Sequence, residues 1–292
     1  MYPVLFTIGS ILIPAYGVMA ALGVLLALLL AQRTARIVGL DTGAVWNLCV
    51  LSIFSALVAS RLLLVLVNWS VLRLHPSWML GLAMIHHPLL AGVGVLAGSL
   101  AALLYARRRK LPLAGTADAL AAPLALGLAF EEAGALLAGS GFGTESSARW
   151  AVTYTNPLAA RWSGAPLGVP VHPVQAYASL AWLAIAVSLY IWLPARRRSG
   201  DGSGLWLLLA GAAIYLTELW RDHEGRGVML GGALDGPQVA AVVMVLLGGL
   251  LLMERKKPVE SCAIPPLRQK EGARVGHGES PELPAKNEAT HV

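Results

Sequence analysis

The sequence contains few charged residues. Asp, Glu, Lys and Arg make up 13% of its 292 residues, whereas 57% are hydrophobic. Soluble globular domains contain about 25% charged residues, so this scarcity excludes an ordinary soluble domain and indicates an integral membrane protein.

Cysteine is almost absent as well. The two cysteines, Cys49 in an apolar run and Cys262 in a polar C-terminal stretch, are too few for a disulfide framework or a zinc site. No cysteine-ligated metal is therefore expected. The net charge of +6 is not accompanied by a basic patch interleaved with aromatic residues. Because such a patch is missing, nucleic acid is excluded as a partner.

Long apolar runs are what the sequence does have. A transmembrane helix needs roughly 20 mostly apolar residues. Seven runs approach this length, at about 11–31, 44–67, 88–105, 116–138, 175–193, 204–221 and 237–254. We predict an all-α, polytopic membrane protein with seven transmembrane helices, formed by residues 1–257. The loop 139–174 is long enough to be functional or disordered. The polar, proline-rich residues 258–292 are predicted to be a disordered cytoplasmic tail.

The basic residues predict the orientation in the membrane. They gather in short clusters at 33–36, 107–110, 196–198 and 255–257. With seven helices, all of these clusters fall on the same side. Because Lys and Arg mark cytoplasmic loops, we expect the N-terminus outside and the C-terminus in the cytoplasm.

Ionisable residues inside the apolar runs gather in the outer half of the predicted membrane. Arg61 in the second run and the adjacent Glu131 and Glu132 in the fourth lie at a similar depth. Arg61 is the expected counter-ion of one glutamate, because a charge inside the bilayer normally finds a partner. Adjacent helical residues point about 100° apart. The other glutamate is therefore expected to face an aqueous cleft or to be protonated. An Arg–Glu pair that only fixes helix packing is an equally good interpretation.

Several stretches, in this order, carry a family resemblance. They are PVLFTIGSILIPAYGVM near the N-terminus, ASRLLLVLVNW around Arg61, LGLAFEEAGALLAGSGFGTESSARWAVTYTNP, GVPVHPVQAYAS and TELWRDHEGRG. Over residues 3–250 the chain resembles the prolipoprotein diacylglyceryl transferase family of bacterial membrane enzymes.

The resemblance implies a function. Enzymes of this family transfer the diacylglyceryl group of phosphatidylglycerol to the lipobox cysteine of prolipoproteins, the first step of lipoprotein biosynthesis. We therefore expect a transferase of the bacterial cytoplasmic (inner) membrane, acting as a monomer without a cofactor. Its expected partners are phosphatidylglycerol and prolipoprotein signal segments.

The resemblance also implies site residues. His172, Arg61 and Tyr16 are the expected catalytic residues. The expected substrate-binding residues are Glu131, Glu132, Gly134, Gly143, Gln175, Tyr177, Glu218 and Arg221. Structural roles remain open beside these: a loop-ordering hydrogen bond for His172 and an interfacial anchor for Tyr16. Glu218 is expected to pair with Arg221, which lies three residues further along the same helix face.

The sequence departs from the family pattern G-R-x-G-N-F-x-N-x-E-x-x-G. The arginine position is occupied by Glu132, and an arginine of the sixth helix is replaced by Ile214. The H-G-G segment before the third helix has no equivalent in register, because His86 and His87 lie several residues upstream. Two alternatives therefore stay open: a catalytically degenerate relative that binds lipid or lipoprotein signal segments, and a sibling transferase with a different donor lipid. A small-molecule transporter is a weaker alternative, because no internal repeat is visible.

Overall fold

The computed structural model describes residues 2–9, 11–73, 88–222, 228–229 and 234–253. The longer helices are α1 (Ala15–Val38), α2 (Thr42–Val67), α4 (Pro88–Arg108), α5 (Leu113–Ala138), α7 (Val174–Trp192), α8 (Asp201–Glu218) and α9 (Gly236–Met253). Shorter ones are α3 (Trp69–Leu72), α6 (Pro157–Ser163) and the 3-10 turn η3 (Leu193–Ala195). Three antiparallel strand pairs join β1 (Val4–Ile8) to β2 (Ile11–Pro14), β3 (Val152–Thr153) to β4 (Pro170–Val171), and β5 (Val228–Met229) to β6 (Leu234–Asp235). His86, His87 and the predicted tail 258–292 lie outside the described residues.

The described part of the chain is mostly helical and apolar on its outside, which confirms a multi-pass membrane protein. Six of the described helices are long and apolar enough to cross a membrane: α1, α2, α4, α5, α7 with η3, and α9. Large apolar side chains point away from the protein, among them Phe54 at 65% exposure and Leu66 at 70%. Such a surface suits lipid rather than water, because lipid tails are as apolar as these side chains.

The first helix begins later than its hydropathy predicts. The apolar run starts near residue 11, but Ile11–Pro14 pairs with Val4–Ile8 as a hairpin, and α1 begins at Ala15. β-branched residues favour strands, and Pro14 has the extended conformation of an N-cap residue, with φ −70° and ψ 135°. Apolarity alone therefore did not distinguish strand from helix in this short segment.

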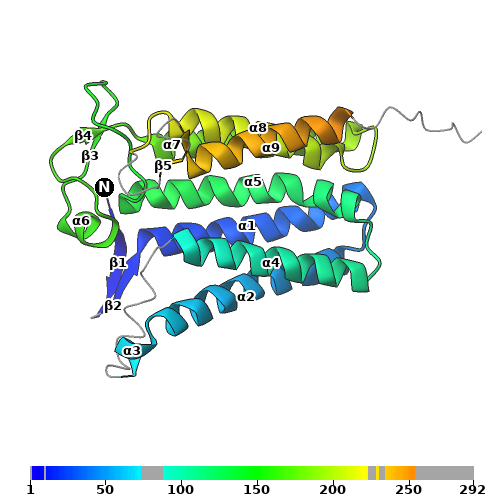
Figure 1. Ribbon diagram of the computed structural model, residues 1–292, viewed down its shortest axis with the longest axis horizontal. Helices are drawn as coiled ribbons and strands as arrows, with labels where there is room; N and C mark the ends of the chain where they lie inside the picture. Colours follow the sequence, from blue (N-terminus) through cyan, green and yellow to red (C-terminus); the bar gives the residue numbers. More distant parts are fainter. Residues whose placement is uncertain (1, 10, 74–87, 223–227, 230–233, 254–292) are drawn as a thin grey trace, which may run out of the picture. The chain divides into compact units, whose positions relative to one another are not determined.

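Helix α5 is the centre of the bundle. It packs against α1, α7 and α8, and Figure 1 shows it between α1 and the α8–α9 pair. Half of its apolar stretch is buried, against a third or less in the other candidate spans. The residues at these contacts are small, such as Ala125 and Ala129 of α5 against Ala178 of α7. Small residues let helices approach closely, which is the main source of helix association in lipid.

The segment between α5 and α7 is ordered, rather than the structureless loop that its composition permits. Its centre is Tyr154, which is 1% exposed and packs with Ala159, Ala165 and Val171. The β3–β4 pair and α6 surround this small core. The segment therefore forms a compact cap beside the C-terminal end of α5, where the two glutamates lie.

Candidate functional site

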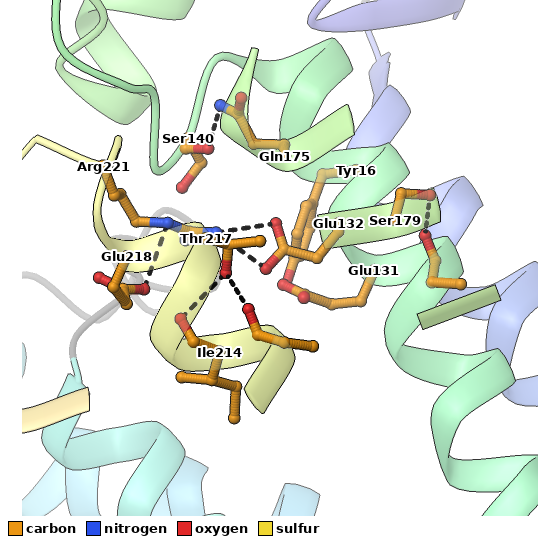
Figure 2. Close-up of polar contacts among 12 residues, drawn as sticks. Tyr16, Glu131, Glu132, Ser140, Gln175, Ser179, Ile214, Thr217, Glu218 and Arg221 are labelled. Atoms are coloured by element: carbon orange, nitrogen blue, oxygen red, sulfur yellow. Dashed lines mark hydrogen bonds and ion pairs between the residues drawn. The ribbon is translucent and has the colours of Figure 1, made fainter. Parts of the chain in front are cut away.

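The two adjacent glutamates near the C-terminal end of α5 have different partners. The hydroxyl of Tyr16, at the start of α1, donates to Oε1 of Glu131 at 2.9 Å. Arg221, just after α8, donates through Nη2 to both oxygens of Glu132, at 3.1 and 3.3 Å. Figure 2 shows this divergence. It follows from the turn of about 100° between neighbouring helical residues.

Arg221 lies between two carboxylates. In addition to its contact with Glu132, its Nε is 3.3 Å from Oε1 of Glu218. All three side chains are nearly buried, with exposures of 11% for Arg221, 14% for Glu132 and 6% for Glu218. The predicted Glu218–Arg221 pair is confirmed. We call these residues, with Tyr16 and Glu131, the α5–α8 polar cluster.

Arg61 was predicted to be the counter-ion of one glutamate, and this prediction is wrong. The structure places Arg221, not Arg61, on Glu132, while Glu131 is hydrogen-bonded to Tyr16. Arg61 lies on α2 with an exposed side chain. Helix α2 packs mainly against α4 and α1. The prediction matched the depths of the two residues, but depth does not specify which way a side chain points around its helix.

Gly134 and Gly143 allow close contacts around the cluster. A Cβ on Gly134 would lie 3.0 Å from Cβ of Met19 and 3.3 Å from Cα of Tyr16, so this glycine brings α1 against α5. A Cβ on Gly143 would lie 2.6 Å from the carbonyl oxygens of His172 and Trp220. Backbone bonds also hold this crossing, because the N–H of Gly143 donates to His172 and that of Thr144 donates to Trp220. Arg221 directly follows Trp220, so these backbone hydrogen bonds fix the position from which the Arg221 side chain extends.

Gln175 ties the cap to the bundle. Its side chain is fully buried, and its Nε2 donates to the carbonyl of Ser140 at 2.8 Å and to the hydroxyl of Tyr154 at 3.4 Å. Burial raises the pKa of Tyr154, so its hydroxyl stays protonated at neutral pH. That hydroxyl donates to the carbonyl of Leu136 in the last turn of α5. Gln175 thus connects the start of α7 to the cap and to α5.

His172 and Tyr177 lie in an aromatic group on the cap side of α7. The indole N–H of Trp150 donates to the hydroxyl of Tyr177 at 2.6 Å, and Nδ1 of His172 is 3.4 Å from the same oxygen. The Tyr177 ring also meets Trp220 edge-on, with centroids 6.3 Å apart. Because an indole N–H can only donate, Tyr177 keeps its own proton available for a second acceptor. The direction of the contact between Tyr177 and Nδ1 of His172 depends on the tautomer of the imidazole.

Sequence reasoning missed Asp118. Its carboxylate is fully buried near the N-terminal end of α5 and accepts hydrogen bonds from the N–H groups of Gly200 and Ser203. The signal was present, because a lone carboxylate inside an apolar run is by default a candidate for a specific role. In the part of the chain that the structure describes, no group of three or more His, Cys, Asp or Glu side chains is placed to hold a metal ion.

Replacing Tyr16 by phenylalanine removes the hydrogen bond to Glu131. We expect the free energy of unfolding to fall by about 1.5 kcal/mol, because the substitution leaves a half-buried carboxyl oxygen without this donor, a loss that typically costs about 1–3 kcal/mol. Titration with denaturing detergent measures this change. Tyr105→Phe is the matched control: the Tyr105 hydroxyl is buried without a hydrogen-bond partner among the described residues, so its removal should change little. Equal effects of the two substitutions would contradict a stabilising Tyr16–Glu131 bond.

Comparisons with known proteins show to which family this sequence belongs. The sequence model of the prolipoprotein diacylglyceryl transferase family matches residues 3–254. A relative from Dehalococcoides mccartyi is 32% identical over 260 residues, which cover 88% of this chain and 92% of the relative. One from Synechococcus elongatus is 29% identical over 254 residues, 86% of each chain. Both are named phosphatidylglycerol–prolipoprotein diacylglyceryl transferase. The chain therefore belongs to the prolipoprotein diacylglyceryl transferase family.

Proposed function

We propose that this protein is a phosphatidylglycerol–prolipoprotein diacylglyceryl transferase of the bacterial inner membrane. Its family supports this function, and the α5–α8 polar cluster is the observation that carries it to a site. The cluster places buried ionisable groups at one end of long apolar helices, beside an ordered cap. A lipid headgroup and the cysteine of a signal segment can meet only where an apolar bundle borders water.

The reaction sets clear demands on the site. The cysteine sulfur attacks the glyceryl carbon of phosphatidylglycerol, a C–S bond forms, the C–O bond to phosphate breaks, and glycerol phosphate leaves. The thiol proton must pass to a base, because the thiolate is the nucleophile. The phosphate needs donors or cations, since an unpaired anion in an apolar site is costly.

The candidate residues divide these roles. Tyr16 and Arg221 are the donors nearest the two glutamates, and a glutamate released from its partner can accept the thiol proton. Arg61, on α2, is a further candidate cation for the phosphate. His172, on the cap side, offers a ring nitrogen that can donate to a phosphate oxygen or accept a proton, according to its tautomer. Gln175 and Tyr177 hold the cap in place around them.

We further propose that the chain crosses the membrane seven times, with α8 as the additional crossing, the N-terminus outside and the C-terminus in the cytoplasm. Contacts along α5 support the additional crossing. The start of α8 contacts Asp118 near one end of α5, and Arg221 beyond its end contacts Glu132 near the other. Helix α8 therefore extends along most of the length of α5. With seven crossings, the basic clusters share the cytoplasmic side.

A complementation experiment tests the function. The gene is expressed in a bacterium depleted of its own diacylglyceryl transferase, and lipoprotein maturation is followed by gel mobility and growth. We expect restored growth with lipidated lipoproteins. A family member that carries the complete G-R-x-G-N-F-x-N-x-E-x-x-G pattern serves as the positive control. Stable membrane expression without lipidated product would favour a relative that only binds lipid or signal segments.

One observation favours a second candidate, a transferase with a different donor lipid. Arg221 contacts two carboxylates at once, so Glu132 and Glu218 compete with a lipid phosphate for its guanidinium. A headgroup that carries an ammonium as well as a phosphate would suffer less from this competition than a purely anionic one. Purified protein offered equal amounts of phosphatidylglycerol and phosphatidylethanolamine distinguishes the two donors by the leaving group, glycerol phosphate or phosphoethanolamine.

A further inference from the structure

Asp118 caps a helix that is not its own. Its Oδ2 accepts the N–H of Gly200 at 2.6 Å and lies 3.3 Å from Nη1 of Arg196, while its Oδ1 accepts the N–H of Ser203 at 2.8 Å. Both carboxylate oxygens are therefore in use. The side chain is fully buried, so water does not compete for them.

Helix α8 needs the Asp118 carboxylate at its N-terminus. It begins at Asp201 after Gly200, and the residue at the N-cap position provides no side-chain hydrogen bond. The first N–H groups of a helix have no partner within the helix, and the positive end of its dipole attracts a carboxylate. Gly202 leaves room for the approach, because a Cβ there would lie 3.1 Å from Oδ1 of Asp118.

The Asp118 carboxylate holds the N-terminal end of α8, and the Glu132–Arg221 pair holds its C-terminal end. Asp118 and Glu132 are about 21 Å apart along α5, at about 1.5 Å per residue. Ser203 and Glu218, which contact Asp118 and Arg221 respectively, are about 22 Å apart along α8. The two spacings agree, so both contacts can form at once between α5 and α8, which run in the same direction.

Apolar packing alone would not select this register. Helices in lipid associate through van der Waals packing and polar contacts, without a hydrophobic driving force between them. Helix α8 also carries α9 with it, because Gly211 and Gly248 bring their backbones into close contact. A shift at the capped end of α8 therefore moves a rigid helix pair, and with it Arg221.

We propose that Asp118 is a positioning residue that sets the register of α8 against α5 and so holds Arg221 on Glu132. Its role in the reaction rests on the proposed function, whereas its role in helix register does not. Asp118 touches none of the reacting groups. It acts from the opposite end of α5 through the position of α8.

The test combines a distance with an activity. Spin labels at Leu22 of α1 and Leu216 of α8, both exposed apolar positions, report the spacing of the two helices in a variant in which Cys49 and Cys262 are serine. Helix α1 represents α5, against which it packs through Gly23 and Gly134. Asp118→Asn keeps the shape of the side chain but turns an amide N–H toward backbone donors. Asp41→Asn, at the carboxylate that caps α2, is the matched control.

Asp118→Asn should shift or broaden the spin-label distance distribution and lower the transfer rate by about tenfold or more, because displacement of a catalytic group by 1 Å can cost a factor of about 100. Asp41→Asn should change neither. An unchanged distribution, or a rate within twofold of the parent, would overturn the proposal. If the parent has no activity, the proposed function fails, and the distance distribution alone decides the register.

Discussion

Replacing Arg221 by glutamine is expected to lower the free energy of unfolding by about 3–5 kcal/mol and to abolish transfer. Removing one member of a buried ion pair leaves the other charge buried without compensation. Here the loss is shared by two carboxylates, because Glu132 and Glu218 both contact the same guanidinium. Denaturing-detergent titration measures stability, and mass spectrometry of a lipobox peptide incubated with the protein and phosphatidylglycerol measures transfer.

Arg149→Gln is the matched control for this substitution. Arg149 lies in the cap with an exposed side chain, and its replacement should change stability by no more than about 0.5 kcal/mol. The double variant Glu132→Gln with Arg221→Gln should be more stable than the sum of the two single losses predicts, because it leaves no unpaired charge between them. Additive losses would contradict the ion pair as the dominant contact of Arg221.

Gly143→Ala should destabilise the protein by about 3 kcal/mol and greatly reduce transfer. The added methyl group would lie 2.6 Å from the carbonyl oxygens of His172 and Trp220 and from Cγ2 of Val174. Backbone atoms cannot move aside as a flexible side chain can, so the crossing must separate, and overpacking of this kind typically costs about 1–3 kcal/mol. The same unfolding titration and transfer assay measure the result.

Gly92→Ala provides the comparison for this glycine. Gly92 lies in α4, where nothing is within 4 Å of an added Cβ. Alanine is a better helix former than glycine, so stability should stay the same or rise slightly. If Gly143→Ala behaved like Gly92→Ala, the close crossing of the cap, α7 and the end of α8 would be wrong.

Hydropathy predicted the helices well because membrane helices must satisfy their backbone hydrogen bonds internally and present apolar side chains to lipid. The fourth run, predicted at about 116–138, corresponds to α5 at Leu113–Ala138. The first run was predicted to start near residue 11, whereas α1 begins at Ala15 after a hairpin. Apolar strand and apolar helix look alike over so few residues.

The site was predicted only in part, because the sequence gives the depth of a residue along its helix but not the direction of its side chain. Counting along a helix gives depth, and depth correctly grouped Tyr16, Glu131 and Glu132 at one end of the bundle. It also paired Arg61 with one of the two glutamates, although the direction of a side chain around its helix depends on packing. Glu218 and Arg221 were paired correctly because their spacing is local. Asp118 could have been noticed as a lone carboxylate in an apolar run, but its partners could not be predicted, because they include backbone N–H groups of a distant turn.

Mass spectrometry of a lipobox peptide incubated with purified protein and phosphatidylglycerol is the direct test of transfer by this protein. We expect a peptide whose cysteine gains one diacylglyceryl group, with release of glycerol phosphate, and no product when that cysteine is serine. Arg221→Gln should remove the adduct while Arg149→Gln retains it. An unmodified peptide would contradict phosphatidylglycerol-dependent transfer by this protein, when a family member with the complete G-R-x-G-N-F-x-N-x-E-x-x-G pattern lipidates the same peptide in parallel.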